Sequence, residues 1–430
     1  MKLHMDLDCY FVSAERTRYP FLKNRPVVVA KGSDKKIFAH TKKEGVILAQ
    51  SGAFNSVLEF TNHYDTNNIS NAWKDEFIDS DGVIHGIVIA KSYEAKKYKI
   101  KIGTPLRDAL VMCPELIVLP SDHLFYQMLS FKLKSYLETK IPLIEQYSID
   151  EFFADLRGWV KKEDTLSFIQ SLQAQILEKF GLPISIVASK SKWIAKLATD
   201  TIKPYGCKVI EDEEIEAFTN PIAIEDFPGI GRAIYKRLKS YGIDTLKDAK
   251  RVPSIFASYG KTGKELYAKI KGEDNEPVKP TCKRKGIGIS RNFPAIEERS
   301  ELRRRVMILS RYLSFTIARL GLRPTTFYMK IRYQYGIKSA KSLTIDRLFN
   351  EDFFAKLTQE LFSELDIHRN YKIHFLALSA TNFIDKSNPK SYDIIDFKKD
   401  TKNEKLMQGL TKIRNKYGVD MVLYGREMVG

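Results

Sequence analysis

The chain has 430 residues, of which 70 are Lys or Arg and 53 are Asp or Glu, so its formal net charge is +17. A chain of this length is expected to form two to four domains, because single cores stop growing at about 250–300 residues. A hydrophobic content of 43% and an aromatic content of 11% exclude a mainly disordered or collagen-like chain. The positive charge indicates a polyanionic partner, either nucleic acid or anionic lipid.

The cysteines and the N-terminus predict a cellular compartment. The four cysteines are too few and too scattered for a disulfide framework, and no CxxC pair offers a zinc site. The N-terminal stretch carries charges and lacks a signal-peptide core, and no later segment approaches the roughly 18 apolar residues of a membrane span. We therefore expect a soluble, cytoplasmic protein with reduced thiols and no membrane partner.

The first half of the chain predicts a sheet with helices packed on it. Residues 33–85 mix Gly, Asn, Asp, Ser and Thr and are interpreted as a surface insertion. Strands are expected at 2–11, 25–30, 86–90 and 184–188, a hairpin at 144–155, and helices from Tyr93 and at 104–112, 122–139, 164–180 and 192–201. This βαββαβ-like run is typical of the α+β class.

The second half predicts a helical region and a second small α/β unit. Short helices with glycine turns run from about 211 to 277, and the tail from Lys386 is polar. Residues 279–305 contain nine basic and three acidic side chains, so the positive charge is concentrated there. The α/β unit is expected to contain helices at 300–320 and 351–365 and strands at 325–335, 339–348 and 371–380, followed by a tail helix at 404–417.

Two pairs of carboxylates are the strongest chemical signal. Asp6 and Asp8 share one face of a strand, and Asp150 and Glu151 lie at the tip of the predicted hairpin. Clustered oxygen ligands without histidine or cysteine favour Mg²⁺, and two such ions can support an in-line phosphoryl transfer. Each pair could instead cap a turn or bind a nearby lysine, and spacing alone does not place Asp6 beside Asp150.

Five segments in this order resemble the Y-family DNA polymerases, the translesion enzymes, and most of all their bacterial DNA polymerase IV branch. They are MDLDCYFVSAE at 5–15, PVVVA at 26–30, SYEAKKYKIKIGTP at 92–105, YSIDE at 147–151 and ASKSKWIAKLATDTIKPYG at 188–206. The resemblance covers the chain to about residue 385.

The resemblance implies an α+β multidomain fold, a right-hand polymerase whose parts follow one another along the chain. They are a catalytic palm at 1–9 and 121–210, fingers at 10–120 with the insertion near 33–85, a helix-hairpin-helix thumb at 211–279, a basic linker at 280–290, a separate α/β little finger at 291–385 and a C-terminal tail at 386–430.

The resemblance also assigns the catalytic carboxylates and the nucleotide contacts. Asp6, Asp150 and Glu151 would hold two Mg²⁺ ions, with the carbonyl of Leu7 as a further ligand, whereas Asp8 matches the family pattern without being an expected ligand. Phe11 falls on the steric-gate position that excludes a ribose 2′-hydroxyl, and Tyr10 lies next to it beneath the sugar. The residues that hold the triphosphate would be Tyr93, Lys96 and Lys203.

Two departures from the family pattern bear on these assignments. The family usually has arginine where Lys96 stands, and lysine keeps the charge but loses the two-pronged guanidinium contact. The insertion is several tens of residues longer than the family's finger segment, and no role is assigned to any residue in it.

The expected DNA contacts follow from glycine-rich turns and basic runs. Pro228, Gly229 and Gly231 belong to a helix-hairpin-helix whose glycines let the backbone approach a phosphate. Lys261 and Gly263 resemble a weaker second copy, for which a structural tight turn is the alternative. Lys283, Arg284 and Lys285 resemble the basic linker along the DNA backbone, while Arg303–Arg305 could equally form a solvated helix face.

A short segment of the tail, Asp393–Phe397, faintly resembles the peptide by which such polymerases dock on the sliding clamp. A local strand or packing patch is the alternative for this segment.

The leading functional hypothesis is template-directed DNA synthesis of low fidelity past lesions, without a proofreading exonuclease. The partners would be primer–template DNA and deoxynucleoside triphosphates, and the protein would be a monomer associated with the bacterial nucleoid when active. A metal-dependent DNA nuclease would leave Phe11, Tyr93 and Lys203 without a role. A non-catalytic DNA-binding scaffold would have no need of all three carboxylates.

Overall fold

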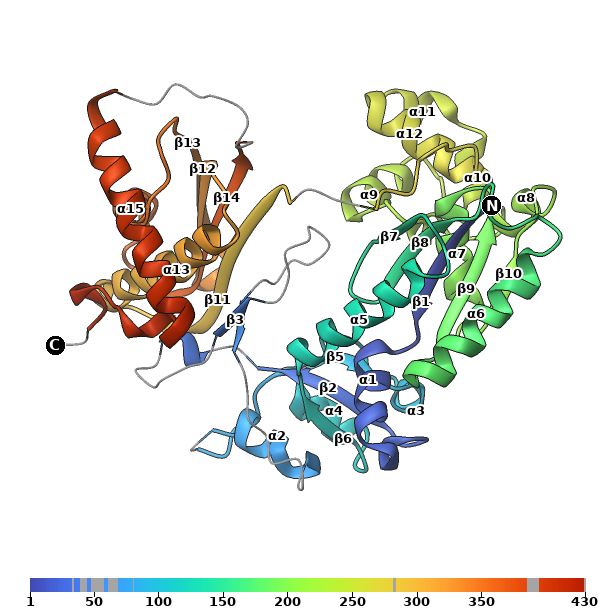
Figure 1. Ribbon diagram of the computed structural model, residues 1–430, viewed down its shortest axis with the longest axis horizontal. Helices are drawn as coiled ribbons and strands as arrows, with labels where there is room; N and C mark the ends of the chain where they lie inside the picture. The colour runs from blue at the N-terminus through green and yellow to red at the C-terminus, as the bar shows by residue number, and fades with distance from the viewer. Residues whose placement is uncertain are drawn as a thin grey trace. The chain divides into compact units, whose positions relative to one another are not determined.

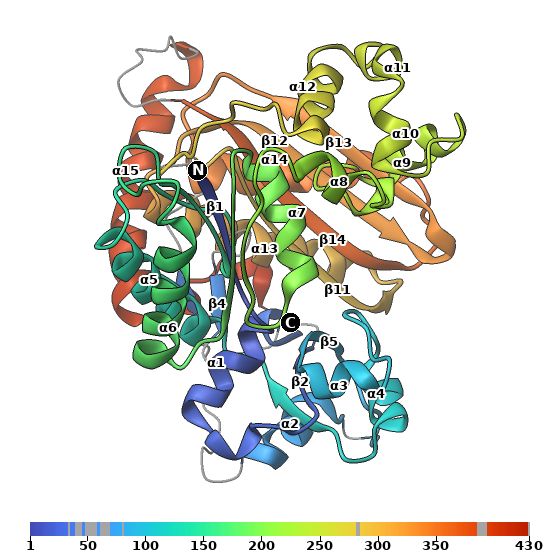
Figure 2. The same cartoon turned by 90° about the vertical axis from the view of Figure 1, so that its right-hand side faces the viewer.

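The structure is a computed structural model that describes residues 1–32, 35–38, 45–47, 58–60, 69–79, 81–280, 284–384 and 394–428 (Figures 1 and 2). These residues belong to two compact units. The first lies within 1–30, 68–121 and 125–282, and the second lies within 31–67, 122–124 and 283–430. In the described part of the chain, no helix combines the length and the apolar character needed to cross a membrane.

The first unit is built on a five-stranded sheet with β1 (Lys2–Leu7) at its centre (Figure 1). The antiparallel strands β8 (Glu151–Asp155) and β9 (Ile184–Ser189) flank β1, and β7 (Ile144–Gln146) and β10 (Cys207–Val209) form the edges. Every residue of β1 is buried, including the polar Lys2, His4 and Asp6, which therefore need partners inside the protein. The predicted hairpin and the strand at 184–188 are confirmed.

Helices of the sheet follow the predicted ranges closely. They are α5 (His123–Glu138), α6 (Thr165–Phe180) and α7 (Lys192–Ile202). The strand expected at 2–11 is too long, because α1 (Tyr10–Arg18) begins directly after Cys9, whose φ of 48° turns the chain out of the sheet. Phe11 therefore lies on a helix.

A smaller three-stranded sheet forms a separate part of this unit (Figure 1). Its order is β5 (Ile87–Lys91), β2 (Val27–Lys31) and β6 (Ile117–Pro120), with helices α2 (Ile69–Phe77), α3 (Tyr93–Lys97) and α4 (Leu106–Met112). Val28, Val88, Val118 and Phe77 pack together in its core.

Short helices follow in the predicted thumb region. They are α8 (Ile215–Thr219), α9 (Arg232–Lys239), α10 (Leu246–Lys250), α11 (Pro253–Ala257) and α12 (Gly260–Lys271). The turn before α9 requires glycine at Gly229, where φ is +101°.

The interpretation of Lys261 and Gly263 as a second glycine turn is wrong, since both residues lie inside α12. A Cβ at Gly263 would lie 2.0 Å from the carbonyl oxygen of Phe256. The glycine therefore serves the close packing of α12 on α11, and Gly263 is not an open turn that a phosphate could approach.

The second unit is a four-stranded antiparallel sheet with helices (Figure 2). The order of strands is β11 (Gly286–Ile296), β14 (Ile373–Phe383), β12 (Pro324–Tyr333) and β13 (Lys338–Thr344). Its helices are α13 (Arg299–Arg319), α14 (Glu351–Leu365) and α15 (Ile394–Tyr417). The predicted bounds of α14 are confirmed.

Two predictions near the ends of this unit need correction. The basic linker expected at 280–290 is shorter, because β11 begins at Gly286 and pairs with β14, so that Arg284 and Lys285 precede a strand. The described part of the clamp-like segment, residues 394–397, begins α15 and is not a strand. Lys283 and Asp393 lie outside the described residues.

The described part of the insertion also differs from a surface loop. The 3₁₀ turn Lys35–Phe38 places Ile37 and Phe38, exposed by only 1% and 6%, in the hydrophobic core of the second unit. The guanidinium of Arg305 lies 4.4 Å from the ring of Phe38 and 4.7 Å from that of Phe293. Strands β3 (Gly45–Ile47) and β4 (Leu58–Phe60) form an antiparallel pair.

These contacts also show whether Arg303–Arg305 form a solvated helix face. Arg304 and Arg305 both pair with Glu301, and Arg304 donates to the carbonyl of Phe38 at 3.2 Å. These two arginines are therefore partly buried ion-pair partners and do not form a solvated face. The remaining residues of the predicted insertion between Ser33 and Asn68 lie outside the described residues.

Candidate active site

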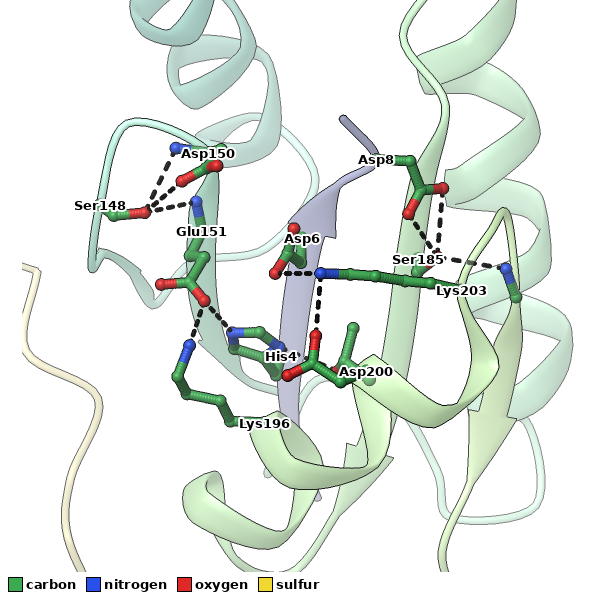
Figure 3. Close-up of polar contacts among 12 residues, drawn as sticks. His4, Asp6, Asp8, Ser148, Asp150, Glu151, Ser185, Lys196, Asp200 and Lys203 are labelled. Carbon is green, nitrogen blue, oxygen red and sulfur yellow. Dashed lines mark hydrogen bonds and ion pairs between the residues drawn. The ribbon is translucent and has the colours of Figure 1, made fainter. Parts of the chain in front are cut away.

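Strand register brings the predicted carboxylates together. Asp6 on β1 is paired with Glu151 on β8, and the backbone N–H of Leu7 donates to the carbonyl of Asp150 at 3.0 Å. The side chains of Asp6, Asp150 and Glu151 consequently lie on one side of the sheet where the two strands meet (Figure 3). The structure thus resolves what spacing left open: Asp6 lies beside Asp150 and Glu151.

Lys203 forms an ion pair with Asp6, the carboxylate on β1. Because Pro204 has no N–H to continue the helix, α7 ends at Ile202 and Lys203 follows directly. Its ammonium donates to Asp6 Oδ2 at 2.7 Å and to Asp200 Oδ1 at 3.0 Å. Burial raises the pKa of Asp6 to about 7, and Lys203 offsets only part of that rise. Burial would lower the pKa of Lys203, but Asp6 and Asp200 raise it on balance.

Glu151 has a different environment from its neighbours. Its Oε1 accepts a hydrogen bond from the ammonium of Lys196, and the Nε2 of His4 lies 3.6 Å from the same oxygen. Burial alone would raise the pKa of Glu151, but His4 and Lys196 together lower it to about 2. Glu151 is therefore the carboxylate of this site that is most firmly ionised.

His4 lies beneath the carboxylates with almost no solvent contact. Its Nδ1 is 2.9 Å from the hydroxyl of Thr199 on α7. Burial lowers the pKa of His4 to about 4, so its imidazole is neutral at pH 7.

Asp150 is held by the hydroxyl of Ser148. Ser148 Oγ donates to Asp150 Oδ1 at 2.5 Å and accepts from the backbone N–H of Glu151 at 3.1 Å. Burial raises the pKa of Asp150, with the Ser148 hydrogen bond acting in the opposite direction. The hairpin tip is thereby ordered by one serine that touches both acidic residues.

Asp8 links the site to the predicted triphosphate residues. Its carboxylate accepts from Ser185 Oγ at 3.0 Å, from the backbone N–H of Tyr205 at 2.7 Å and from the Tyr93 hydroxyl at 3.4 Å. Tyr93 opens the short helix α3, whose N-cap Ser92 accepts from Ala95 N–H, and the exposed Lys96 lies on the same helix. Asp8 thus holds Tyr93 near the carboxylates through a hydrogen bond.

Two aromatic residues at the start of α1 are fixed by α5. The ring of Phe11 stacks on that of Tyr126, with 4.5 Å between centroids and an interplanar angle of 15°. Tyr10 is buried, and its hydroxyl donates to the carbonyl of Tyr126 at 2.5 Å. The ring predicted to be the sugar gate is therefore supported from behind by a second ring.

Sequence reasoning missed several residues of the site. His4 precedes Asp6 by two residues on a strand, which puts the two side chains on one face. Lys196 precedes Lys203 by seven residues, which is two turns of helix and again one face. These two spacings were the available signals, whereas Ser148 and Ser185 carried none.

The residues present suit a divalent cation. His4, Asp6 and Glu151 can each offer one ligand atom, and the three atoms lie within 4.8 Å of one another. A buried carboxylate with a pKa near 7 lacks full compensation for its charge, which a hard cation supplies. Oxygen-rich ligand sets of this kind favour Mg²⁺ or Mn²⁺.

The start of α9 is one part of the expected DNA-binding surface. A Cβ added at Gly231, the N-cap of this eight-residue helix, would meet nothing within 4 Å. The backbone at Gly231 is therefore open on the side where a Cβ would lie.

Comparisons with known proteins agree with this geometry. Residues 5–200 match the impB/mucB/samB family, and residues 284–394 match the C-terminal domain of the same family. The chain is 30% identical over 360 residues to a DNA polymerase IV of Alkaliphilus oremlandii, covering 78% of this chain and 88% of that protein. It is 28% identical to a DNA polymerase IV of Dehalococcoides mccartyi, covering 99% and 96% of the two chains.

Solved structures show the same fold. A chimeric Y-family DNA polymerase of Dbh and Dpo4 superposes with a TM-score of 0.67 at 22% identity, covering 89% of this chain and 99% of that one. An insertion ternary complex of Dbh DNA polymerase gives a TM-score of 0.55 with the same identity and coverage. The multidomain α+β fold is that of the Y-family polymerases, and the chain belongs to this family, in its DNA polymerase IV-like, impB/mucB/samB branch.

Proposed function

We propose that this protein is a template-directed DNA polymerase of low fidelity that acts in translesion synthesis. The observation that carries the proposal is the meeting of Asp6, Asp150 and Glu151 at the junction of β1 and β8 in a chain of this family. The 3′-hydroxyl of a primer attacks the α-phosphate of a deoxynucleoside triphosphate. The new O–P bond forms as the α–β phosphoanhydride bond breaks and pyrophosphate leaves.

Each part of the site has a role in this proposal. Asp6, Asp150, Glu151 and the carbonyl of Leu7 would hold two Mg²⁺ ions, which when bound activate the hydroxyl and stabilise the leaving oxygen. Tyr93, Lys96 and Lys203 would hold the triphosphate. Phe11 would exclude the ribose 2′-hydroxyl, supported by its stacking on Tyr126, with Tyr10 beneath it.

The proposed DNA contacts come from the thumb region and from the residues before β11. Pro228, Gly229 and Gly231 would meet the backbone phosphates through the start of α9, and Lys261, exposed by 90% in its side chain, would add charge. Lys283, Arg284 and Lys285 would contact DNA next to β11.

We further propose that the protein is a monomer in the bacterial cytoplasm and is associated with the nucleoid when active.

Primer extension with Mg²⁺ and four deoxynucleotides, comparing the wild type with Asp150→Ala, tests the function. We expect the variant to lose activity on the order of 10³-fold, because a metal ligand is removed. The exposed Asp212 provides the control variant Asp212→Ala, which should extend normally. Shortening of the primer would favour the nuclease, and binding without extension by the wild type would favour the scaffold.

Phe11→Ala tests the sugar gate. Loss of the ring should raise ribonucleotide incorporation relative to deoxynucleotide by roughly tenfold or more, since a steric exclusion is removed. Phe21, exposed by 49%, gives the matched control Phe21→Ala. Unchanged sugar selection in Phe11→Ala would rule out the gate assignment.

A clamp contact through the tail is proposed on the exposure of two apolar residues. Ile395 and Phe397, at the start of α15, are exposed by 91% and 46%. Binding of the host's sliding clamp should weaken in an Ile395→Ala, Phe397→Ala double variant, and equal binding by both proteins would remove the proposal.

A further inference from the structure

Lys196 contacts Glu151, one of the three carboxylates of the site, and the proposed function leaves this lysine without a role. It lies on α7, its side chain is exposed by 18%, and its ammonium donates to Glu151 Oε1. Among the described residues, Lys196 makes the closest side-chain contact with Glu151, since His4 Nε2 lies 3.6 Å from the same oxygen. Figure 3 shows Lys196 and His4 converging on this one oxygen.

A cation at Glu151 would have to share the carboxylate with this ammonium. A bound divalent cation needs the carboxylate charge that Lys196 now compensates, and two cations on one carboxylate repel each other. Lysine is a point charge on a flexible stem, so it can leave a single contact more readily than a planar guanidinium can.

The ammonium of Lys196 has a second contact beside the one with Glu151. The ring centroid of Tyr147 lies 5.3 Å from Lys196 Nζ, within the range of a cation–π contact. Tyr147 is itself partly exposed, so the ammonium can stay hydrated there. Lys203 also has a second partner, because its ammonium donates to Asp200 as well as to Asp6.

We infer that Lys196 is a positioning residue that holds Glu151 in the metal-free site and competes with a divalent cation for it. The inference rests on the proposed function, because it takes Glu151 as a metal ligand. Lys196 thereby sets how much free metal the site needs, and it keeps Glu151 oriented while no metal is bound.

Mn²⁺ binding, followed by the electron paramagnetic resonance signal of the free ion without DNA or nucleotide, tests the inference apart from activity. Lys196→Met should bind Mn²⁺ roughly three- to tenfold more tightly than the wild type, since the competing cation is gone. Lys196→Arg should bind equally or more weakly, because a guanidinium holds a carboxylate with two contacts. Lys190→Met, which removes an exposed lysine paired with Asp212, is the matched control and should bind as the wild type does.

Glu151→Gln separates failure of the inference from failure of the ligand assignment. Wild-type Mn²⁺ affinity in Glu151→Gln would show that Glu151 is not a ligand and would overturn both. Weakened binding in Glu151→Gln together with unchanged or weaker binding in Lys196→Met would overturn the role of Lys196 alone. Should Lys196→Met not fold, Lys196→Gln removes the same charge and is read in the same way.

Discussion

The second unit and the active site both bury carboxylates, but they hold them with different cations. In the second unit, Arg311 donates to Glu427 at 2.9 and 3.0 Å, and Arg414 donates to Glu351 at 2.6 and 3.0 Å. Two further carboxylates of the second unit each receive two hydrogen bonds from one arginine: Asp400 from Arg347, and Asp366 from Arg299.

The carboxylates of the active site are paired with lysines instead. Glu151 accepts from the ammonium of Lys196, and Asp6 accepts from the ammonium of Lys203.

Arginine–carboxylate pairs are expected to be permanent, whereas lysine–carboxylate pairs can exchange their cation. A guanidinium is always charged, matches both oxygens of a carboxylate and is weakly hydrated, so a buried pair of this kind stays closed. An ammonium makes a single contact and is easily rehydrated. The second unit therefore uses its carboxylates as parts of the core, whereas the active site keeps its carboxylates available to another cation.

The largest expected effect is on the second unit. Arg311→Met should lower the free energy of unfolding of this unit by about 3–5 kcal/mol, because Glu427, exposed by 2%, would remain buried without its partner. Urea unfolding followed by circular dichroism measures the loss. An Arg311→Met, Glu427→Met double variant should recover most of it, whereas Lys196→Met should cost no more than about 1 kcal/mol. Equal losses of unfolding free energy in Arg311→Met and Lys196→Met would contradict the distinction between the arginine pairs of the second unit and the lysine pairs of the active site.

A second prediction uses the pKa of Asp6. The pKa is about 7 in the folded protein against 3.8 for the ordinary group, so the folded state retains a proton that the unfolded state has lost between these pH values. The stabilisation is full below about pH 4 and is lost as the pH rises to 7, by about 1.4 kcal/mol for each unit by which the pKa is raised.

Comparison with Asp6→Asn measures this loss. The free-energy difference between the metal-free wild type and the variant should shift against the wild type from pH 4 to pH 7. The difference is the right quantity, because His4, with its pKa lowered to about 4, makes the stability of both proteins rise with pH over part of that range. A difference that does not change with pH would contradict the assignment.

The smallest expected effect comes from exchanging the type of cation. Arg414→Lys keeps the charge beside Glu351 but loses one of two hydrogen bonds, which should cost about 1.5 kcal/mol in urea unfolding. The reverse exchange in the active site, Lys196→Arg, should change the unfolding free energy by about 0.5 kcal/mol or less. If the two exchanges cost the same, the guanidinium gives no advantage in the second unit.

Local patterns predicted the strands of the central sheet except β10, and also helix α14, while the family motifs singled out Asp6, Asp150 and Glu151, which the structure brings together. They succeeded there because alternation and helical periodicity are local, and because the family motifs are contiguous. Lys196 was missed because its partner Glu151 lies 45 residues away in the sequence, on another element. Gly263 was misread because a glycine in a helix looks like a turn until the neighbouring helix is known.

The largest error concerned Ile37 and Phe38. Polar composition around them predicted a surface insertion, but two apolar residues are enough to anchor a segment in a distant core. The ion pairs of Arg311 and Arg414 were also unpredictable, because they join α13 and α14 to residues from the end of the chain. Each of these failures involves contacts that are remote in sequence.

The position of Phe38 in the core of the second unit has a consequence for protein synthesis. The segment emerges from the ribosome early, whereas β11, which contains its ring partner Phe293, follows roughly 250 residues later. At about 5–20 residues per second, the apolar side chains wait on the order of 10–50 s before even Phe293 is synthesised. During that interval Ile37 and Phe38 are available to chaperones, so the nascent chain of this polymerase is a candidate client from its first forty residues onward.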